Sequence, residues 1–215
     1  ITVPDAPAFD MGKIIDRKDK VVKKLTGGVK MTVGSYGVAI VEKEAVIAGE
    51  ENGMFRIVAG GETYEATYLL VCTGSDTVIP PIPGLSDTDY WTSKEALESK
   101  ELPRSLVIIG GGVIGMEFAS FYTSLGRRVT VLEAADRILP GMDREISQNL
   151  RLILKKRGAD IRTGAALSRV EKDPDGGLRC FWQEKGKEES LSCDGLLVAV
   201  GRRGLAEGAF APECR

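Results

Sequence analysis

Hydrophobic residues in the middle of this chain gather in short runs, and the segments between the runs have helical periodicity. Segments 105–109, 128–132 and 160–163 are predicted strands, with helices at 113–125 and about 144–157 between them. Strands and helices that alternate in this order predict a parallel sheet with right-handed crossovers. The chain therefore has the pattern of an α/β protein.

The pattern then changes to an antiparallel meander. Strands are predicted at about 166–171, 178–183 and 188–192, with Pro174-Asp175-Gly176-Gly177 as one of the turns. A fully apolar strand at 195–200 follows and runs into Gly201-Arg202-Arg203. This last segment favours a strand buried on both faces.

The first hundred residues contain a long helix and short strands. Residues 10–35 are predicted to be helical with one apolar stripe, which Gly27 and Gly28 should weaken or end. Strands are expected at 38–41, 45–47, 54–58, 63–67 and 68–72, with Gly60-Gly61 as a hairpin turn. We expect 68–72 to be buried on both faces and Cys72 to be buried and inert.

Two signals follow the last of these strands. Pro80, Pro81, Pro83 and Gly84 mark a crossover between domains. Thr92-Ser93-Lys94-Glu95 has the form of a capping box, which predicts a short helix through about Ser99.

The turn after the strand 105–109 has the sequence G-x-G-x-x-G, formed by Gly110, Gly112 and Gly115. Gly110 allows a tight turn, Gly112 allows the backbone to approach a pyrophosphate, and Gly115 allows the helix to pack close to the strand. The start of the helix offers free N–H groups and a partial positive charge to phosphates. Together with the flanking strand and helix, this turn predicts a dinucleotide site.

Glu133 bears on which dinucleotide binds. It ends the second strand, 18 residues after Gly115. A carboxylate there accepts hydrogen bonds from both ribose hydroxyls and repels a 2′-phosphate, and Ala134 and Ala135 offer no positive charge. The predicted ligand is NAD rather than NADP.

Composition excludes several other functions. A net charge of −2 gives no indication of nucleic acid or an anionic membrane as a partner, and no apolar run reaches the length of a membrane span. The four cysteines form no close pair in sequence, so we expect no metal site. No signal-peptide pattern begins the chain, and with the cysteine usage this favours the cytoplasm. The absence of histidine removes the usual general acid or base.

Several motifs, taken in order, resemble the FAD- and NAD-dependent pyridine nucleotide-disulfide oxidoreductases, and within that family the dihydrolipoamide dehydrogenases. They are Val71-Cys72-Thr73-Gly74-Ser75, Ile82-Pro83-Gly84, Thr92 to Leu97, Val107 to Ala119, Asp136-Arg137-Ile138-Leu139-Pro140, and Val198 to Arg203. The resemblance implies a Rossmann-like NAD-binding domain at 84–204. Part of a similar FAD-binding domain would precede it at 1–83, and a tail would follow at 205–215.

The resemblance also implies roles for particular residues. Thr73-Gly74-Ser75 would approach FAD and Ala45 its adenine, while Glu117 would pair with a lysine near the flavin rather than being an exposed helix acid. Val113 would cover the nicotinamide pocket, and Leu167 and Gly201 would touch NAD. The implied cofactor-binding set is Gly110, Gly111, Gly112, Val113, Ile114, Gly115, Glu117, Glu133, Leu167, Gly201, Ala45, Thr73, Gly74 and Ser75.

Other family motifs do not occur in these 215 residues. They are the FAD-binding G-x-G-x-x-G, the redox pair C-x-x-x-x-C, the later Gly-Asp motif and the C-terminal domain with its catalytic histidine. The chain resembles the middle of a longer protein, so we expect it to contain no catalytic residue and to be inactive alone.

The implied function is the NAD-binding segment of a flavoenzyme that passes electrons from a dithiol through FAD to NAD. The intact enzyme would be a homodimer and a candidate member of a 2-oxo acid dehydrogenase complex. Alternatives within the family are a disulfide reductase such as a coenzyme A-disulfide reductase, an NADH oxidase or a transhydrogenase. A non-catalytic dinucleotide-binding or sensor module is an alternative of another class.

Overall fold

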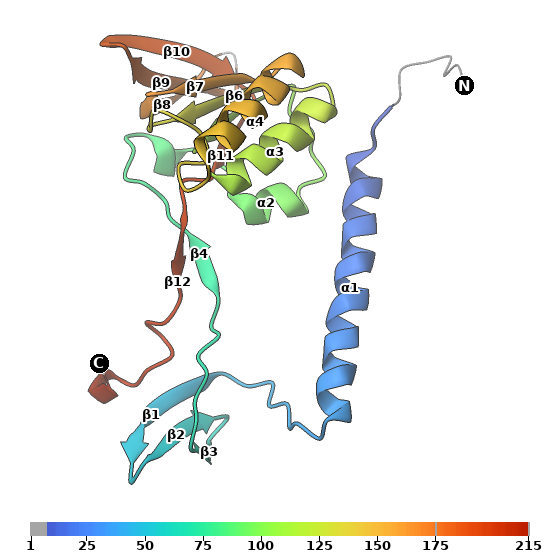
Figure 1. Ribbon diagram of the computed structural model, residues 1–215, viewed down its shortest axis with the longest axis vertical. Helices are drawn as coiled ribbons and strands as arrows, with labels where there is room; N and C mark the ends of the chain where they lie inside the picture. Colours follow the sequence, from blue (N-terminus) through green and yellow to red (C-terminus); the bar gives the residue numbers. More distant parts are fainter. Residues whose placement is uncertain (1–7, 175, 215) are drawn as a thin grey trace. The chain divides into compact units, whose positions relative to one another are not determined.

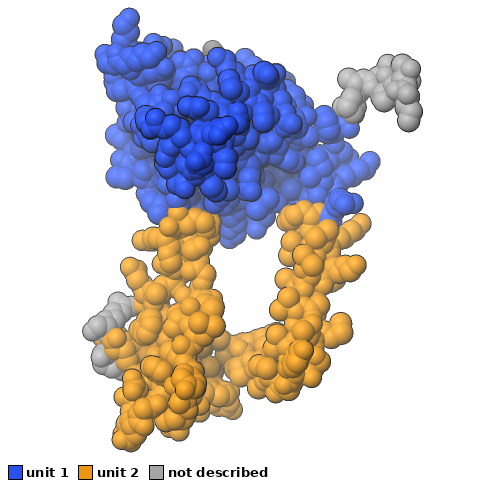
Figure 2. Space-filling model, in the orientation of Figure 1, with its two compact units in different colours: residues 1–17, 77–201 blue, residues 18–76, 202–215 orange. Residues whose placement is uncertain are grey.

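The chain folds into two compact units. A computed structural model describes residues 8–174 and 176–214. Of the described residues, the first unit holds 8–17 and 77–201, and the second holds 18–76 and 202–214 (Figure 2).

A four-stranded parallel sheet lies at the centre of the first unit. Its order is β11-β5-β6-β7, and each neighbouring pair is parallel. The connections through helices α3 and α4 confirm the predicted alternation of strands and helices. The elements are β5 (Ser105–Ile109), α3 (Val113–Ser124), β6 (Arg128–Glu133), α4 (Arg144–Lys156), β7 (Asp160–Thr163) and β11 (Gly195–Val198).

Both faces of this sheet are covered, which explains why its strands are continuously apolar. Leu106 and Ile108 of β5 pack with the helices α2 (Ser93–Glu98), α3 and α4. Val107 and Ile109, which alternate with them, face the antiparallel meander. The meander is β8 (Ala166–Lys172), β9 (Leu178–Glu184) and β10 (Lys187–Cys193), and Figure 1 shows these layers.

Local signals in the first unit also have the predicted geometry. Thr92 is the N-cap of α2, and its hydroxyl accepts a hydrogen bond from the Lys94 N–H at 3.2 Å. The backbone N–H of Thr92 in turn donates to Glu95 Oε2 at 2.8 Å. The Thr92 hydroxyl also holds the pKa of Glu95 below its ordinary value. The predicted turn after β8 includes Asp175, which lies outside the described residues.

The second unit contains a small antiparallel sheet, with the order β1-β2-β3. Gly60 and Gly61, at φ values of +60° and +85°, form the predicted turn between β2 and β3. A separate pair joins β4 to β12. The elements are β1 (Ala45–Glu51), β2 (Met54–Ala59), β3 (Glu62–Ala66), β4 (Ser75–Thr77) and β12 (Arg202–Gly204), with a short 3₁₀ turn at Pro212–Cys214. The other 3₁₀ turn, Leu85–Asp87, belongs to the first unit.

Helix α1 (Met11–Ser35) is as long as predicted, but most of its apolar stripe is not covered. Only Met11 and Ile15 are buried, against Leu125 of the first unit. Leu25 is 64% exposed. The helix continues through Gly27 and Gly28, so the prediction that they could end it is wrong. Within the described ranges, no helix has both the length and the apolar character needed to span a membrane.

Two predicted strands do not form. Residues 38–41 and 68–72 have no strand structure, Tyr68 is 90% exposed, and Cys72 is exposed rather than buried. A strand needs a neighbour for its backbone hydrogen bonds, and within the described residues neither segment has one. The apolar strand β11 is also shorter than predicted, because it ends at Val198 before the backbone turns at Gly201, where φ is +143°.

Candidate functional site

The glycine turn after β5 is shaped by two very close backbone contacts. At Gly110, where φ is +103°, a Cβ would lie 2.4 Å from the Ala199 carbonyl oxygen. At Gly115, a Cβ would lie 2.0 Å from the Gly110 carbonyl oxygen. Neither position has room for a side chain, so these glycines fix the tight turn and the close packing of α3 against β5.

Gly112 is different, because the space beside it is open. It is the N-cap of α3 with φ −72°, and among the described residues no atom outside the neighbouring backbone lies within 4 Å of the position that a Cβ would take. No side chain among the described residues caps α3, so the first N–H groups of the helix face this space. A glycine cradle at a helix start fits an anionic pyrophosphate.

Glu133 braces the turn from the end of β6. Its Oε2 accepts a hydrogen bond from the Gly111 N–H at 2.5 Å, and its Oε1 accepts from the Ala135 N–H at 2.7 Å. Each carboxylate oxygen has a second lone pair, so the half-buried group can still accept from ribose hydroxyls. The brace was not predicted from the sequence.

The loop after Glu133 completes this support. The Leu139 N–H donates to the Gly111 carbonyl at 2.8 Å, and a Cβ on Gly111 would lie 3.0 Å from an Ile138 methyl group. Leu139 is buried with φ +48°, a conformation that ordinary side chains rarely adopt. In the sequence this loop stands out only as part of the family resemblance. The signal that could have found it is an apolar pair, Ile138-Leu139, inside a polar loop.

The remaining expected NAD contacts are placed in different environments. Val113 is 49% exposed at the start of α3, next to Ile114, and Glu117 is exposed one turn further along the helix. Leu167 is buried between the sheet and the meander. Gly201 lies two residues after Ala199, whose carbonyl meets Gly110.

The expected FAD contacts lie in the second unit. Ala45 and Thr73 line the same cavity of about 440 Å³, together with residues 203–205 and 207–209. The Gly74 carbonyl accepts from the Leu205 N–H at 3.0 Å, and Ser75 Oγ accepts from Arg202 Nε at 2.9 Å. The 202–205 segment therefore holds Thr73-Gly74-Ser75 in place, a contact that the sequence did not predict.

The cysteines form no metal site among the described residues, where no group of three or more metal-binding side chains occurs. Cys180 and Cys193 of the meander are both buried with their sulfur atoms 3.9 Å apart. Contact with the Cys193 thiol, together with burial, holds the pKa of Cys180 above its ordinary value. This thiol is therefore a poor nucleophile.

Comparison with known proteins decides the family. The model for pyridine nucleotide-disulphide oxidoreductases matches residues 3–213. The chain belongs to the pyridine nucleotide-disulphide oxidoreductase family. The resemblance seen in the motifs is therefore confirmed, and so is the α/β architecture with a Rossmann-type sheet that this family shares.

Relatives within the pyridine nucleotide-disulphide oxidoreductases include dihydrolipoyl dehydrogenases. The protein of that name from Acholeplasma laidlawii is 37% identical over 204 residues, which are 93% of this chain and 58% of that protein. The one from Haloferax volcanii is 37% identical over 91% of this chain and 42% of its own length. The chain thus spans about half the length of these relatives.

Superposition on solved structures is consistent with the assignment to this family. The HOCl-induced flavoprotein disulfide reductase RclA from Escherichia coli superposes with a TM-score of 0.76 at 32% identity, covering 95% of this chain and 46% of that one. LpdA from Mycobacterium tuberculosis superposes with a TM-score of 0.81, covering 94% of this chain and 45% of its own. Because its sequence is only 23% identical, this similarity supports the fold alone.

Proposed function

We propose that this chain is the NAD-binding segment of a flavin-dependent, dihydrolipoamide dehydrogenase-like oxidoreductase. The observation that carries the proposal is the open cradle at Gly112, bounded by two glycines that admit no side chain and braced by Glu133. The 37% identity to dihydrolipoyl dehydrogenases supports the choice within the family.

In this proposal the residues bind and orient the dinucleotide. The N–H groups of Gly112, Val113 and Ile114 receive the pyrophosphate, and Glu133 accepts hydrogen bonds from the adenosine ribose. The exposed Val113 side chain covers the nicotinamide pocket, with Glu117 on the same helix and Leu167 and Gly201 as further contacts. Bound NAD supplies the ring that accepts hydride from reduced flavin.

FAD is proposed to contact the second unit. Ala45 and Thr73 line one cavity, and Gly74 and Ser75 are held beside it by backbone and side-chain hydrogen bonds. The proposed domains are residues 1–83, which contribute to FAD binding, residues 84–204, which bind NAD, and a tail at 205–215. None of the residues of this chain is assigned a catalytic role.

The proposal extends to the intact enzyme, which would be a cytoplasmic homodimer and a candidate component of a 2-oxo acid dehydrogenase complex. A second candidate is a flavoprotein that reduces a disulfide instead of oxidising a dithiol. The observation in its favour is the 32% identity to a flavoprotein disulfide reductase. Both candidates use the same nucleotide cradle.

We expect the chain to bind NADH more tightly than NADPH, because the Glu133 carboxylate repels a 2′-phosphate. Calorimetric titration of both nucleotides measures the ratio of the two dissociation constants. Glu133→Ala should bring the two dissociation constants closer together. Glu98→Ala, which removes an exposed carboxylate from α2, should leave their ratio unchanged. Equal or tighter binding of NADPH by the natural chain would contradict the proposed specificity.

A further inference from the structure

A small cavity between the loop after β6 and helix α4 contains an unusual concentration of positive charge. Its volume is about 170 Å³, and it lies entirely within the first unit. Three arginines and a single carboxylate line it, together with neutral polar side chains. The charged and polar lining residues are Asp136, Arg137, Arg144, Ser147, Gln148 and Arg151.

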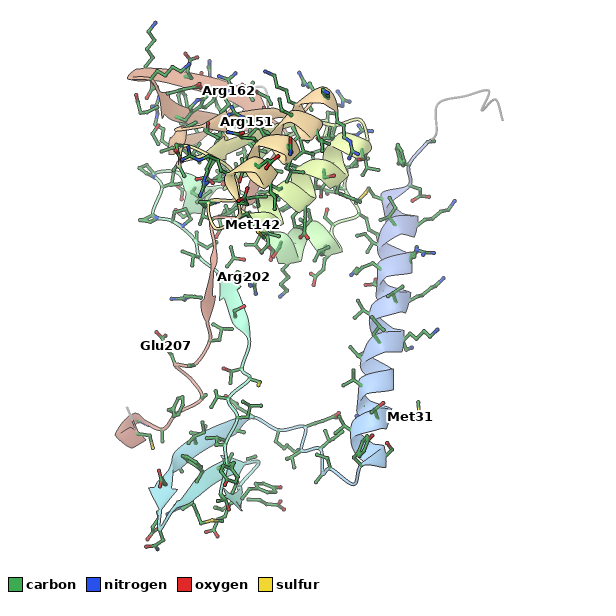
Figure 3. All side chains as sticks on the ribbon, viewed as in Figure 1. Met31, Met142, Arg151, Arg162, Arg202 and Glu207 are labelled. Atoms are coloured by element: carbon green, nitrogen blue, oxygen red, sulfur yellow. The ribbon has the colours of Figure 1, made fainter. Side chains whose placement is uncertain are left out.

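The backbone holds two of the guanidinium groups in place. Arg137 Nη2 donates to the Pro140 carbonyl at 2.7 Å, and Arg151 Nη2 donates to the Ile161 carbonyl at 3.1 Å. A guanidinium has five N–H donors, so each keeps others for a ligand. Arg151 projects from α4 (Figure 3).

Arg144 lies on the same side of the helix as Arg151. It is the first residue of α4, exposed, and seven positions before Arg151, which brings the two onto one helix face. Both residues line the cavity.

Protein carboxylates do not neutralise these arginines. Within the described part of the chain, none of the three forms a salt bridge, whereas Arg162 of β7 and Arg169 of β8 each have two acidic partners. The Ser147 hydroxyl donates to the Leu139 carbonyl at 3.3 Å, and Gln148 adds a neutral amide donor beside the arginines. The lining therefore has three positive charges and one negative charge, and is complementary to a dianion.

The structure assigns this cavity as a binding site for a phosphate group. Arginine forks match the geometry of phosphate oxygens, and the volume suits a single phosphate rather than a nucleotide. The group could come from free inorganic phosphate or from a 5′-phosphate monoester, whereas a 2′-phosphate on the adenosine ribose is disfavoured by Glu133. The site does not depend on the proposed function, because none of the glycines of the turn lines it.

The test is calorimetric titration of inorganic phosphate into the natural chain and into Arg144→Gln/Arg151→Gln. We expect saturable binding to the natural chain and a dissociation constant at least about tenfold larger for the double variant, from the loss of two charge-assisted contacts. Arg157→Gln, at the C-terminal end of α4 and outside the cavity, is the matched control and should bind like the natural chain. Arg144→Lys should bind with intermediate affinity.

Two further titrations separate the sources of phosphate. Adenosine 5′-monophosphate binding about tenfold more tightly than both inorganic phosphate and adenosine 2′-monophosphate would identify a 5′-phosphate monoester, and equal affinities would identify free phosphate. Adenosine 2′-monophosphate binding more tightly than both other ligands would contradict this assignment and the expected preference for NADH. Failure of the natural chain to bind any of the three would overturn the assignment. So would unchanged phosphate binding by Arg144→Gln alone, a surface substitution that breaks no hydrogen bond of the fold. NADH titration of the same variants should show unchanged affinity, so that a failure of the nucleotide site is seen separately.

Discussion

Replacing Gly115 with alanine is expected to lower the free energy of unfolding of the first unit by about 3 kcal/mol, at the upper end of the usual cost of overpacking. The added methyl group would lie 2.0 Å from the Gly110 carbonyl oxygen, which belongs to the backbone and cannot rotate away. Helix α3 would have to move off strand β5, which would break the packing of Met116 and Ala119 in the core.

Urea denaturation followed by circular dichroism measures this loss. Gly141→Ala is the matched control, because Gly141 lies in an exposed loop without a positive φ, and among the described residues no atom outside the neighbouring backbone lies within 4 Å of the position that its methyl group would take. It should change stability by less than about 0.5 kcal/mol. If Gly115→Ala is as stable as the control, the close approach of α3 to β5 is wrong.

Replacing Gly112 with alanine should, unlike Gly115→Ala, leave the free energy of unfolding unchanged and weaken nucleotide binding. Its backbone at φ −72° accepts any residue, and its neighbourhood is open. The new methyl group would occupy the space assigned to the pyrophosphate and remove charge-assisted hydrogen bonds that contribute about 1.5–3 kcal/mol each. The dissociation constant for NADH should therefore rise roughly 10- to 100-fold.

Calorimetry of NADH binding, with thermal unfolding of the same sample, measures both parts of this prediction. Gly141→Ala again serves as the control. A Gly112→Ala variant that binds NADH with unchanged affinity would show that the pyrophosphate does not lie in the cradle. A variant that loses stability as well as affinity would show that Gly112 has a structural role like that of Gly115.

Most of the first unit could be predicted from the sequence because its signals are local. The strands of a sheet covered on both faces are continuously apolar, and two of the helices, α2 and α4, begin after the capping residues Thr92 and Asp143. The three glycines of the turn could be given separate roles for the same reason: each role follows from the spacing between one strand and one helix.

The errors and omissions concern contacts between distant residues. Residues 68–72 have the composition of a buried strand, but burial requires neighbouring strands, which local composition does not reveal. The brace from Glu133 to Gly111 and the left-handed conformation of Leu139 both depend on tertiary packing. The apolar stripe of α1 was identified correctly, but the sequence does not show which part of it is covered.

If a dinucleotide binds with its phosphates at the start of α3, titration of NADH followed by ¹H–¹⁵N correlation spectroscopy should detect it at the backbone amides there. We expect saturable shifts of the Gly112, Val113 and Ile114 amide signals, with smaller shifts at Gly111 and Ala135 transmitted through Glu133. If NADH binding saturates while the amide signals of Gly112, Val113 and Ile114 stay in place, the phosphates of the dinucleotide do not lie at the start of α3.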